Sequence, residues 1–320
     1  MRWDRFRLFV AGQFTLRKVA IVLLLMGLVA SMVLRSMKER IEESYVDPLP
    51  DEFSRLLPLH TKLGKPQPGD WLKGAFELGQ TFREYARGSP VIPDETRRTI
   101  YVQPLGDVSA KQNRIIDRTA EFLGISFGLP VKICPALSAE LVPEGARRKH
   151  SDEQTEQFLT TYIMQDILRP RLPDDACIYF AFTASDLWPG EGWNYLFGQG
   201  TIKERVGVCS LNRLGQPDES AEAFHLCLLR TLKIASHEAG HVFSMQHCTL
   251  FECNMCGSNN RDELDRRPLE LCPQCLAKLC YATGADPEKR FEKLIAFCRV
   301  NGLKPQQKFY EKSLAAIRGK

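Results

Sequence analysis

Three histidines and one glutamate within residues 237–247 are the side chains of this chain best suited to bind a metal and move a proton: His237, Glu238, His241 and His247. His237 and His241 are four residues apart, so on a helix both imidazoles lie on one face and can bind a single zinc ion. Glu238 lies beside them, where its carboxylate can accept a proton from a zinc-activated water. His247 becomes a third ligand if the helix ends near residue 243 and the chain turns back. The spacing therefore predicts a catalytic zinc site with Glu238 as the general base.

The same stretch matches the extended pattern HExxHxxGxxH except at one position, where Ser244 replaces the glycine. Glycine there allows the left-handed backbone that ends the helix, and any other residue costs on the order of 1 kcal/mol. Zinc binding at protein sites is worth about 10 kcal/mol or more. We therefore expect the chain to make the same turn at Ser244 and the site to form.

Four of the 11 cysteines could form a second metal site. Disulfide frameworks are typical of short secreted chains, whereas closely spaced cysteine pairs in longer chains more often bind metal. Two sets of four are compatible with a tetrahedral structural zinc site. Cys253, Cys256, Cys272 and Cys275 have the CxxC-x15-CxxC spacing of a zinc ribbon, and the alternative set contains Cys248 in place of Cys256.

A long helix must position the histidines, and the sequence predicts one that begins among capping residues at 217–220 and runs into His237. Residues 176–182 are apolar throughout, which predicts a central strand buried on both faces. Pro104 and Gly124 are expected to end a strand and a helix, respectively. Further strands are predicted at 100–102, 131–134, 194–198 and 205–210, and further helices at 115–123, 158–167 and 291–297. This mixture indicates an α+β protein.

The composition is that of an ordinary globular protein with a full core: of 320 residues, 44% are hydrophobic and 26% charged. The net charge of +4 comes from the amino terminus, because residues 1–40 hold eight of the 43 Lys and Arg but only two of the 39 Asp and Glu. The rest of the chain is close to neutral. It lacks the concentrated basic face of a nucleic-acid-binding protein, so we expect no nucleic-acid partner.

An uncharged apolar run at residues 19–34 lies between basic residues and predicts a transmembrane helix within an N-terminal segment of residues 1–45. We expect this single helix to anchor the protein in a membrane. Five Lys and Arg precede the run and three follow it, so the positive-inside bias would keep the amino terminus in the cytoplasm. A cleaved signal peptide followed by secretion is one alternative, and a buried core helix is another.

Two further regions complete the expected organisation. Residues 46–97 contain seven prolines, which predicts a linker that packs onto the neighbouring domain rather than an independent fold. Residues 98–320 are expected to form the catalytic domain.

The stretches HEAGHVFSMQHCTLFECNM at 237–255 and RRPLELCPQCLAKL at 266–279 resemble the archaemetzincins, metzincin peptidases in which a cysteine-bound second zinc follows the third histidine. Weaker likeness, such as GDWL at 69–72 and IYVQPLG at 100–106, extends the resemblance over about residues 65–300. It implies that Met255 is the Met-turn methionine beneath the histidines, and that the structural zinc is bound by Cys248, Cys253, Cys272 and Cys275.

The resemblance also implies a metzincin-like zincin domain with a twisted mixed β-sheet, an active-site helix and a C-terminal subdomain from about residue 244. The implied function is hydrolysis of peptide or protein substrates by zinc-activated water, with an extended peptide added to an edge strand at 194–198. Two zinc ions per chain are expected, one catalytic and one structural. The sequence does not distinguish an aminopeptidase from an endopeptidase, and it indicates no oligomeric state.

Two alternative functions follow from the same residues. A non-catalytic zinc-stabilised interaction module would use the metal sites but would have no use for Glu238. A zinc-ribbon nucleic-acid binder would use the cysteines, and the near-neutral charge of residues 41–320 disfavours it.

Overall fold

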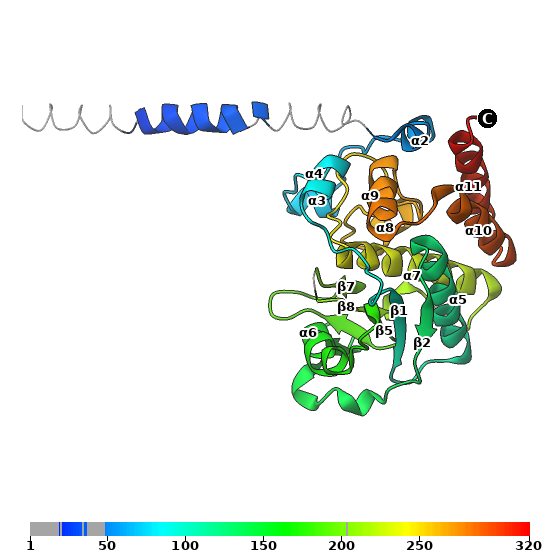
Figure 1. The fold of residues 1–320 in the computed structure, drawn as a ribbon. Helices are drawn as coiled ribbons and strands as arrows, with labels where there is room; N and C mark the ends of the chain where they lie inside the picture. Colours follow the sequence, from blue (N-terminus) through cyan, green and yellow to red (C-terminus); the bar gives the residue numbers. More distant parts are fainter. Residues whose placement is uncertain (1–18, 20, 34, 37–48, 203) are drawn as a thin grey trace, which may run out of the picture. The chain divides into compact units, whose positions relative to one another are not determined.

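The computed structural model describes residues 19, 21–33, 35–36, 49–202 and 204–320, which fall in two units, residues 1–47 and 48–320 (Figure 1). In the first unit, residues 21–33 are helical with exposed side chains, and most of the predicted segment 1–45 lies outside the described residues. None of the helices in the described residues is long and apolar enough to cross a membrane. The transmembrane helix predicted at residues 19–34, and the membrane localisation that depended on it, are therefore wrong. The physical reason is length, because the run has only sixteen residues and a spanning helix needs about 20.

The second unit contains a five-stranded mixed sheet with the strand order β2-β1-β5-β8-β7. Its strands are β1 (Thr99–Leu105), β2 (Val131–Ile133), β5 (Ala176–Thr183), β7 (Gly198–Gly200) and β8 (Val206–Ser210). The edge strand β7 is antiparallel to β8, and the other neighbours are parallel. Every residue of the central strand β5 is buried, as its apolar sequence predicts. A separate three-stranded sheet consists of β3 (Arg147–Lys149), β4 (Glu156–Leu159) and β6 (Asp186–Trp188).

Helices cover both faces of the five-stranded sheet, which gives the mixed α+β fold that we expected (Figure 1). α5 (Ala110–Phe127) and α7 (Ala221–Val242) pack against each other and between them contact β1, β2, β7 and β8. On the other face, α6 (Thr160–Tyr162) continues into η4 (Ile163–Leu168) and η5 (Arg169–Arg171). The apolar side chains of η4 form a core cluster with Tyr179 and Ala181 of β5. Further short turns are η2 (Ala139–Leu141), η3 (Glu144–Ala146) and η6 (Asn212–Leu214).

Two elements are longer than their sequence patterns predict. α5 continues past Gly124 to Gly128, which has a left-handed φ of 66° and ends the helix. Gly124 has a packing role instead, since a Cβ at this position would lie 2.9 Å from the Val131 side chain on β2. β1 continues through Pro104, whose carbonyl accepts a hydrogen bond from Leu137 beyond the end of β2. The N–H and the carbonyl of a strand residue point to the same side, so the N–H that Pro104 lacks would face the side on which β2 has already ended. No hydrogen bond between β1 and β2 is lost.

The remaining helices lie toward both ends of the second unit. After α7 come α8 (Arg261–Arg266), α9 (Pro273–Thr283), α10 (Pro287–Val300) and α11 (Lys304–Ile317). Residues 49–97 form α2 (Asp51–Ser54), η1 (Leu57–Leu59), α3 (Trp71–Gly74) and α4 (Phe82–Arg87). Both α2 and α4 contact α9. These contacts bring the proline-rich region to the part of the molecule that follows the histidines.

Candidate metal centre and active site

Helix α7 carries the first two histidines and ends where the sequence predicts. The Ser220 hydroxyl caps its amino end by accepting a hydrogen bond from the Ala223 N–H at 3.0 Å. The helix ends at Val242, and Ser244 adopts the expected left-handed backbone with φ of 67°. Its hydroxyl accepts a hydrogen bond from the Val91 N–H at 3.1 Å. Glycine could not supply this acceptor, so the serine has a compensating contact in its strained conformation.

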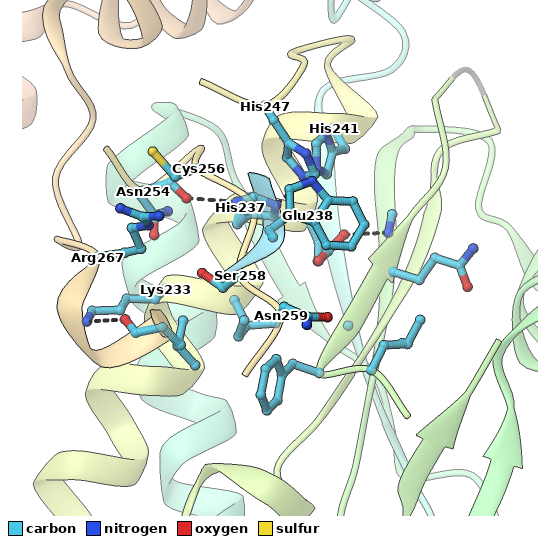
Figure 2. A pocket seen from close by; sticks show the side chains of 18 of the residues that line it. Lys233, His237, Glu238, His241, His247, Asn254, Cys256, Ser258, Asn259 and Arg267 are labelled. Atoms are coloured by element: carbon cyan, nitrogen blue, oxygen red, sulfur yellow. Dashed lines mark hydrogen bonds between the residues drawn. The ribbon is translucent and has the colours of Figure 1, made fainter. Parts of the chain in front are cut away.

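The turn at Ser244 brings His247 back to the helix, and three imidazoles converge (Figure 2). One nitrogen from each of His237, His241 and His247 lies within 4.8 Å of the other two. The Nε2 atoms of His237 and His241 are only 3.0 Å apart. Two ring nitrogens at that separation, with a third nearby, form a cluster of lone pairs suited to a shared cation.

Acceptors behind the rings fix which nitrogen carries the proton. The Nδ1 atoms of His237 and His241 each lie 2.7 Å from a backbone carbonyl oxygen, those of Asn254 and Met245. A carbonyl oxygen can only accept, so each Nδ1 must donate and each Nε2 keeps its lone pair. The His247 Nδ1 in the same way lies 2.8 Å from a carboxylate oxygen of Glu77. Three Nε2 lone pairs with oriented rings fit a zinc ion, whose usual ligands include neutral histidine.

Burial keeps the first two rings neutral. Removal from water holds the pKa of His237 well below its usual value and lowers the pKa of His241 to about 4. Neutral imidazole is the form that binds metal, so these rings need not lose a proton first at neutral pH.

Glu238 lies beside the histidines and contacts the edge strand of the sheet (Figure 2). Its Oε2 accepts a hydrogen bond from the Gly200 N–H at 2.7 Å. Burial raises the pKa of Glu238 to about 7, against the opposing effect of the Gly200 N–H. A carboxylate with a pKa near neutrality can both accept and release a proton at physiological pH. Glycine is required at position 200 because a Cβ there would lie 2.4 Å from the Glu238 carbonyl oxygen.

A cavity of about 490 Å³ opens beside Glu238 and the three histidines. Aromatic side chains form much of its wall, including Trp71, Trp193, Tyr195 and Phe197. Figure 2 also places polar side chains around it: Lys233, Asn254, Ser258, Asn259 and Arg267. Its size and mixed lining suit a side chain or a short segment of a peptide.

The predicted cysteines form a second cluster in the buried core. The sulfur atoms of Cys248, Cys253, Cys272 and Cys275 all lie within 4.8 Å of one another. The Cys253 sulfur also accepts hydrogen bonds from the Met255 and Cys272 N–H groups. Four crowded sulfur atoms with N–H donors fit a tetrahedral structural zinc.

The alternative set, in which Cys256 replaces Cys248, does not cluster in this way. Cys256 is outside the group of four, its thiol donates to the Phe251 carbonyl at 3.2 Å, and its side chain lines the cavity. The neighbouring Met255 is fully buried, and a Cβ at Gly240 would lie 2.6 Å from its sulfur. Met255 therefore lies against the helix turn between His237 and His241, the place expected of a Met-turn residue.

Two contacts of the site were missed by reasoning from sequence. Glu77 lies in the region that we expected to be a linker, 170 residues from His247. Gly200, which donates to Glu238, lies just beyond the edge strand predicted at residues 194–198. The strand forms at Gly198–Gly200 instead, where pairing with β8 begins. No spacing rule connects either residue to the histidines, although the likeness at GDWL included the neighbouring Trp71.

Comparison with known proteins shows the family of this chain. The model of Peptidase family M54 matches residues 111–280, more than half of the chain. Archaemetzincin-2 of Homo sapiens is 30% identical over 262 residues, covering 71% of this chain and 71% of the relative. Archaemetzincin-2 of Macaca fascicularis is 30% identical over 266 residues with the same coverage. The matches define the class of the protein as a zinc metallopeptidase. Within that class, the chain belongs to peptidase family M54, the archaemetzincins.

The solved structures to which the chain is similar include an archaemetzincin from Methanopyrus kandleri. That structure has a TM-score of 0.48 and 24% identity, and the match covers 61% of this chain and 100% of that one. A zinc-dependent peptidase from Methanocorpusculum labreanum has a TM-score of 0.45 and 21% identity, with 56% and 99% covered.

Proposed function

We propose that this protein hydrolyses peptide bonds at His237, His241 and His247 with Glu238 as the general base. The observation that carries the proposal is the convergence of three oriented Nε2 atoms next to a buried carboxylate in the wall of a cavity. We further propose a second, structural zinc at Cys248, Cys253, Cys272 and Cys275, and therefore two zinc ions per chain.

A zinc ion at the histidines would supply a Lewis acid that polarises the scissile carbonyl and makes a water molecule more acidic. The protein's own groups perform the other tasks. The Glu238 carboxylate takes the proton from the attacking water and passes it to the departing amine. The Gly200 N–H holds this carboxylate in place while its proton is gained and lost.

The edge strand β7 offers a place for the substrate. β7 pairs with β8 on one side only, so an extended peptide can add to its free edge by main-chain hydrogen bonds. The sequence placed this surface at residues 194–198, and we now propose Gly198–Gly200 with the residues that precede it. Glu238 contacts the same strand, so such a peptide would pass close to the proposed base.

The experiment is the variant Glu238→Gln, assayed for cleavage of a peptide library by mass spectrometry. Glutamine keeps the shape of the side chain but cannot accept the proton, so we expect turnover to fall by about 10²–10⁴-fold. Zinc content should be unchanged, because Glu238 is not a proposed ligand. Glu222→Gln, an exposed change near the start of the same helix, is the matched control and should leave turnover unchanged.

Two results would contradict the proposal. Cleavage by Glu238→Gln at the wild-type rate would show that another group is the base. If the zinc-loaded wild-type protein cleaves no peptide in the library, the protein is instead a non-catalytic zinc-stabilised interaction module.

A further inference from the structure

The third histidine is held differently from the first two. His237 and His241 lie on α7, so a rigid helix places their rings. His247 lies in irregular chain after the helix, and among the described residues no backbone carbonyl accepts a hydrogen bond from its ring. Its Nδ1 instead lies 2.8 and 2.9 Å from the two carboxylate oxygens of Glu77. The orientation of the third ring therefore depends on a side chain from a distant part of the sequence.

We propose that Glu77 is a positioning residue that orients His247 for zinc. Residues 69–82, which hold Glu77 in place, then belong to the metal centre. This inference rests on the proposed role of the three histidines. The matched stretch of the family model begins at residue 111, after this whole segment. A carboxylate behind a metal-binding histidine fixes the ring and makes its free nitrogen a stronger donor.

Trp71 supports Glu77 from the same segment. Its indole N–H donates to Glu77 Oε1 at 2.9 Å. Its ring also meets the His247 ring edge-on, with 5.5 Å between the ring centres and an angle of 82°. The two residues together limit both the rotation and the tilt of His247.

The segment itself is tied to the chain that follows α7, which keeps Glu77 in place. At its start, the backbone N–H of Trp71 donates to the Glu263 carboxylate at 2.9 Å. At its end, the Phe82 N–H donates to the Gln274 side chain at 2.7 Å. Between them, the Gln80 side chain accepts from the Gln246 N–H at 3.2 Å, next to His247. The segment is thus fixed on both sides of Glu77, and the carboxylate reaches His247 from a rigid support.

The test measures the zinc dissociation constant of the histidine site in the full chain, by competition with a chelator. Glu77→Ala should weaken binding by about 10–100-fold, the usual effect of removing such a partner. Glu77→Gln should have a smaller effect, because its amide oxygen can accept the N–H but carries no charge. Trp71→Phe keeps the ring contact and loses one donor to Glu77, so its effect should be smaller again. Glu95→Gln, an exposed change in the same region, is the control and should bind zinc as the wild type does.

The outcomes separate the two proposals. If the wild-type protein binds no zinc at the histidines, the proposed function fails. If it binds zinc there and Glu77→Gln binds equally well, this inference fails. A lower melting temperature of zinc-free Glu77→Gln with unchanged zinc affinity would assign Glu77 a purely structural role, which also overturns it. If Glu77→Ala does not fold, Glu77→Gln decides the matter, because its side chain has the same shape.

Discussion

At the scale of single residues, the site is defined by acceptors as much as by ligands. His237, His241 and His247 each donate from Nδ1, and the partners are two carbonyls and one carboxylate. Ser244 also contributes through a hydrogen-bond acceptor. It makes the left-handed turn between the second and third histidines, and its hydroxyl accepts a hydrogen bond from a backbone N–H. A small change in any of these partners should therefore act on the metal site.

Ser244 offers a test at this scale. Ser244→Ala keeps the unfavourable φ but loses the acceptor for the Val91 N–H, so we expect the free energy of unfolding to fall by about 1 kcal/mol. Ser244→Gly loses the same hydrogen bond but removes a backbone cost of about the same size, so it should be close to neutral. Urea denaturation of the zinc-loaded variants measures both. Equal destabilisation by alanine and glycine would show that the turn is not strained.

At the scale of elements, the close approach of α7 to β7 places the base against the strand proposed to bind substrate. Two glycines make this approach possible. A Cβ at Gly198 would lie 2.8 Å from the Ile234 side chain, and one at Gly200 would lie 2.4 Å from the Glu238 carbonyl oxygen. The helix and the strand are therefore nearer to each other than side chains at positions 198 and 200 would allow.

Gly200→Ala should separate these two elements. Its new methyl group would meet backbone rather than a flexible side chain, so we expect a loss of about 1–3 kcal/mol in stability. Peptide turnover should fall further than stability predicts, because the N–H that holds Glu238 moves away. Calorimetry and the peptide assay measure the two effects. Gly64→Ala is the control, since a Cβ there meets nothing within 4 Å. Normal turnover in Gly200→Ala would contradict the role of this contact.

At the scale of the whole molecule, the two proposed metal sites share one loop. Cys253 belongs to the cysteine cluster, the next residue Asn254 accepts from His237, and Met255 lies against Gly240. The Cys248 N–H also donates to the Met255 carbonyl at 2.8 Å. The structural site is thus connected directly to the orientation of the first histidine.

Cys272→Ser should therefore damage both sites. We expect elemental analysis to give one zinc ion or fewer per chain instead of two, together with a lower melting temperature, because structural zinc contributes folding energy. Peptide turnover should fall although no histidine has changed. Cys134→Ser, outside the cluster, is the control. Comparison of the zinc content of Cys248→Ser and Cys256→Ser identifies the ligand, since only substitution of the true ligand should release the metal. A zinc content that Cys272→Ser leaves at the wild-type value would rule out the cysteine site.

Local spacing in the sequence was enough to predict several parts of this protein. Histidines four residues apart on a capped helix must share a face, and α7 carries them as predicted. A wholly apolar run predicted the buried strand β5, and closely spaced cysteine pairs predicted the sulfur cluster. The histidine pair, the apolar strand and each cysteine pair span only a few residues, so backbone geometry alone relates the side chains within each of them.

The distant residues that complete the site could be identified only from the way whole elements pack. Glu77 reaches His247 across 170 residues, and Gly200 reaches Glu238 because β7 is the edge strand next to α7. It also brought Cys248 rather than Cys256 into the cluster of four. Such contacts follow from how whole elements pack, and packing depends on the combined burial of many side chains rather than on the spacing of a few.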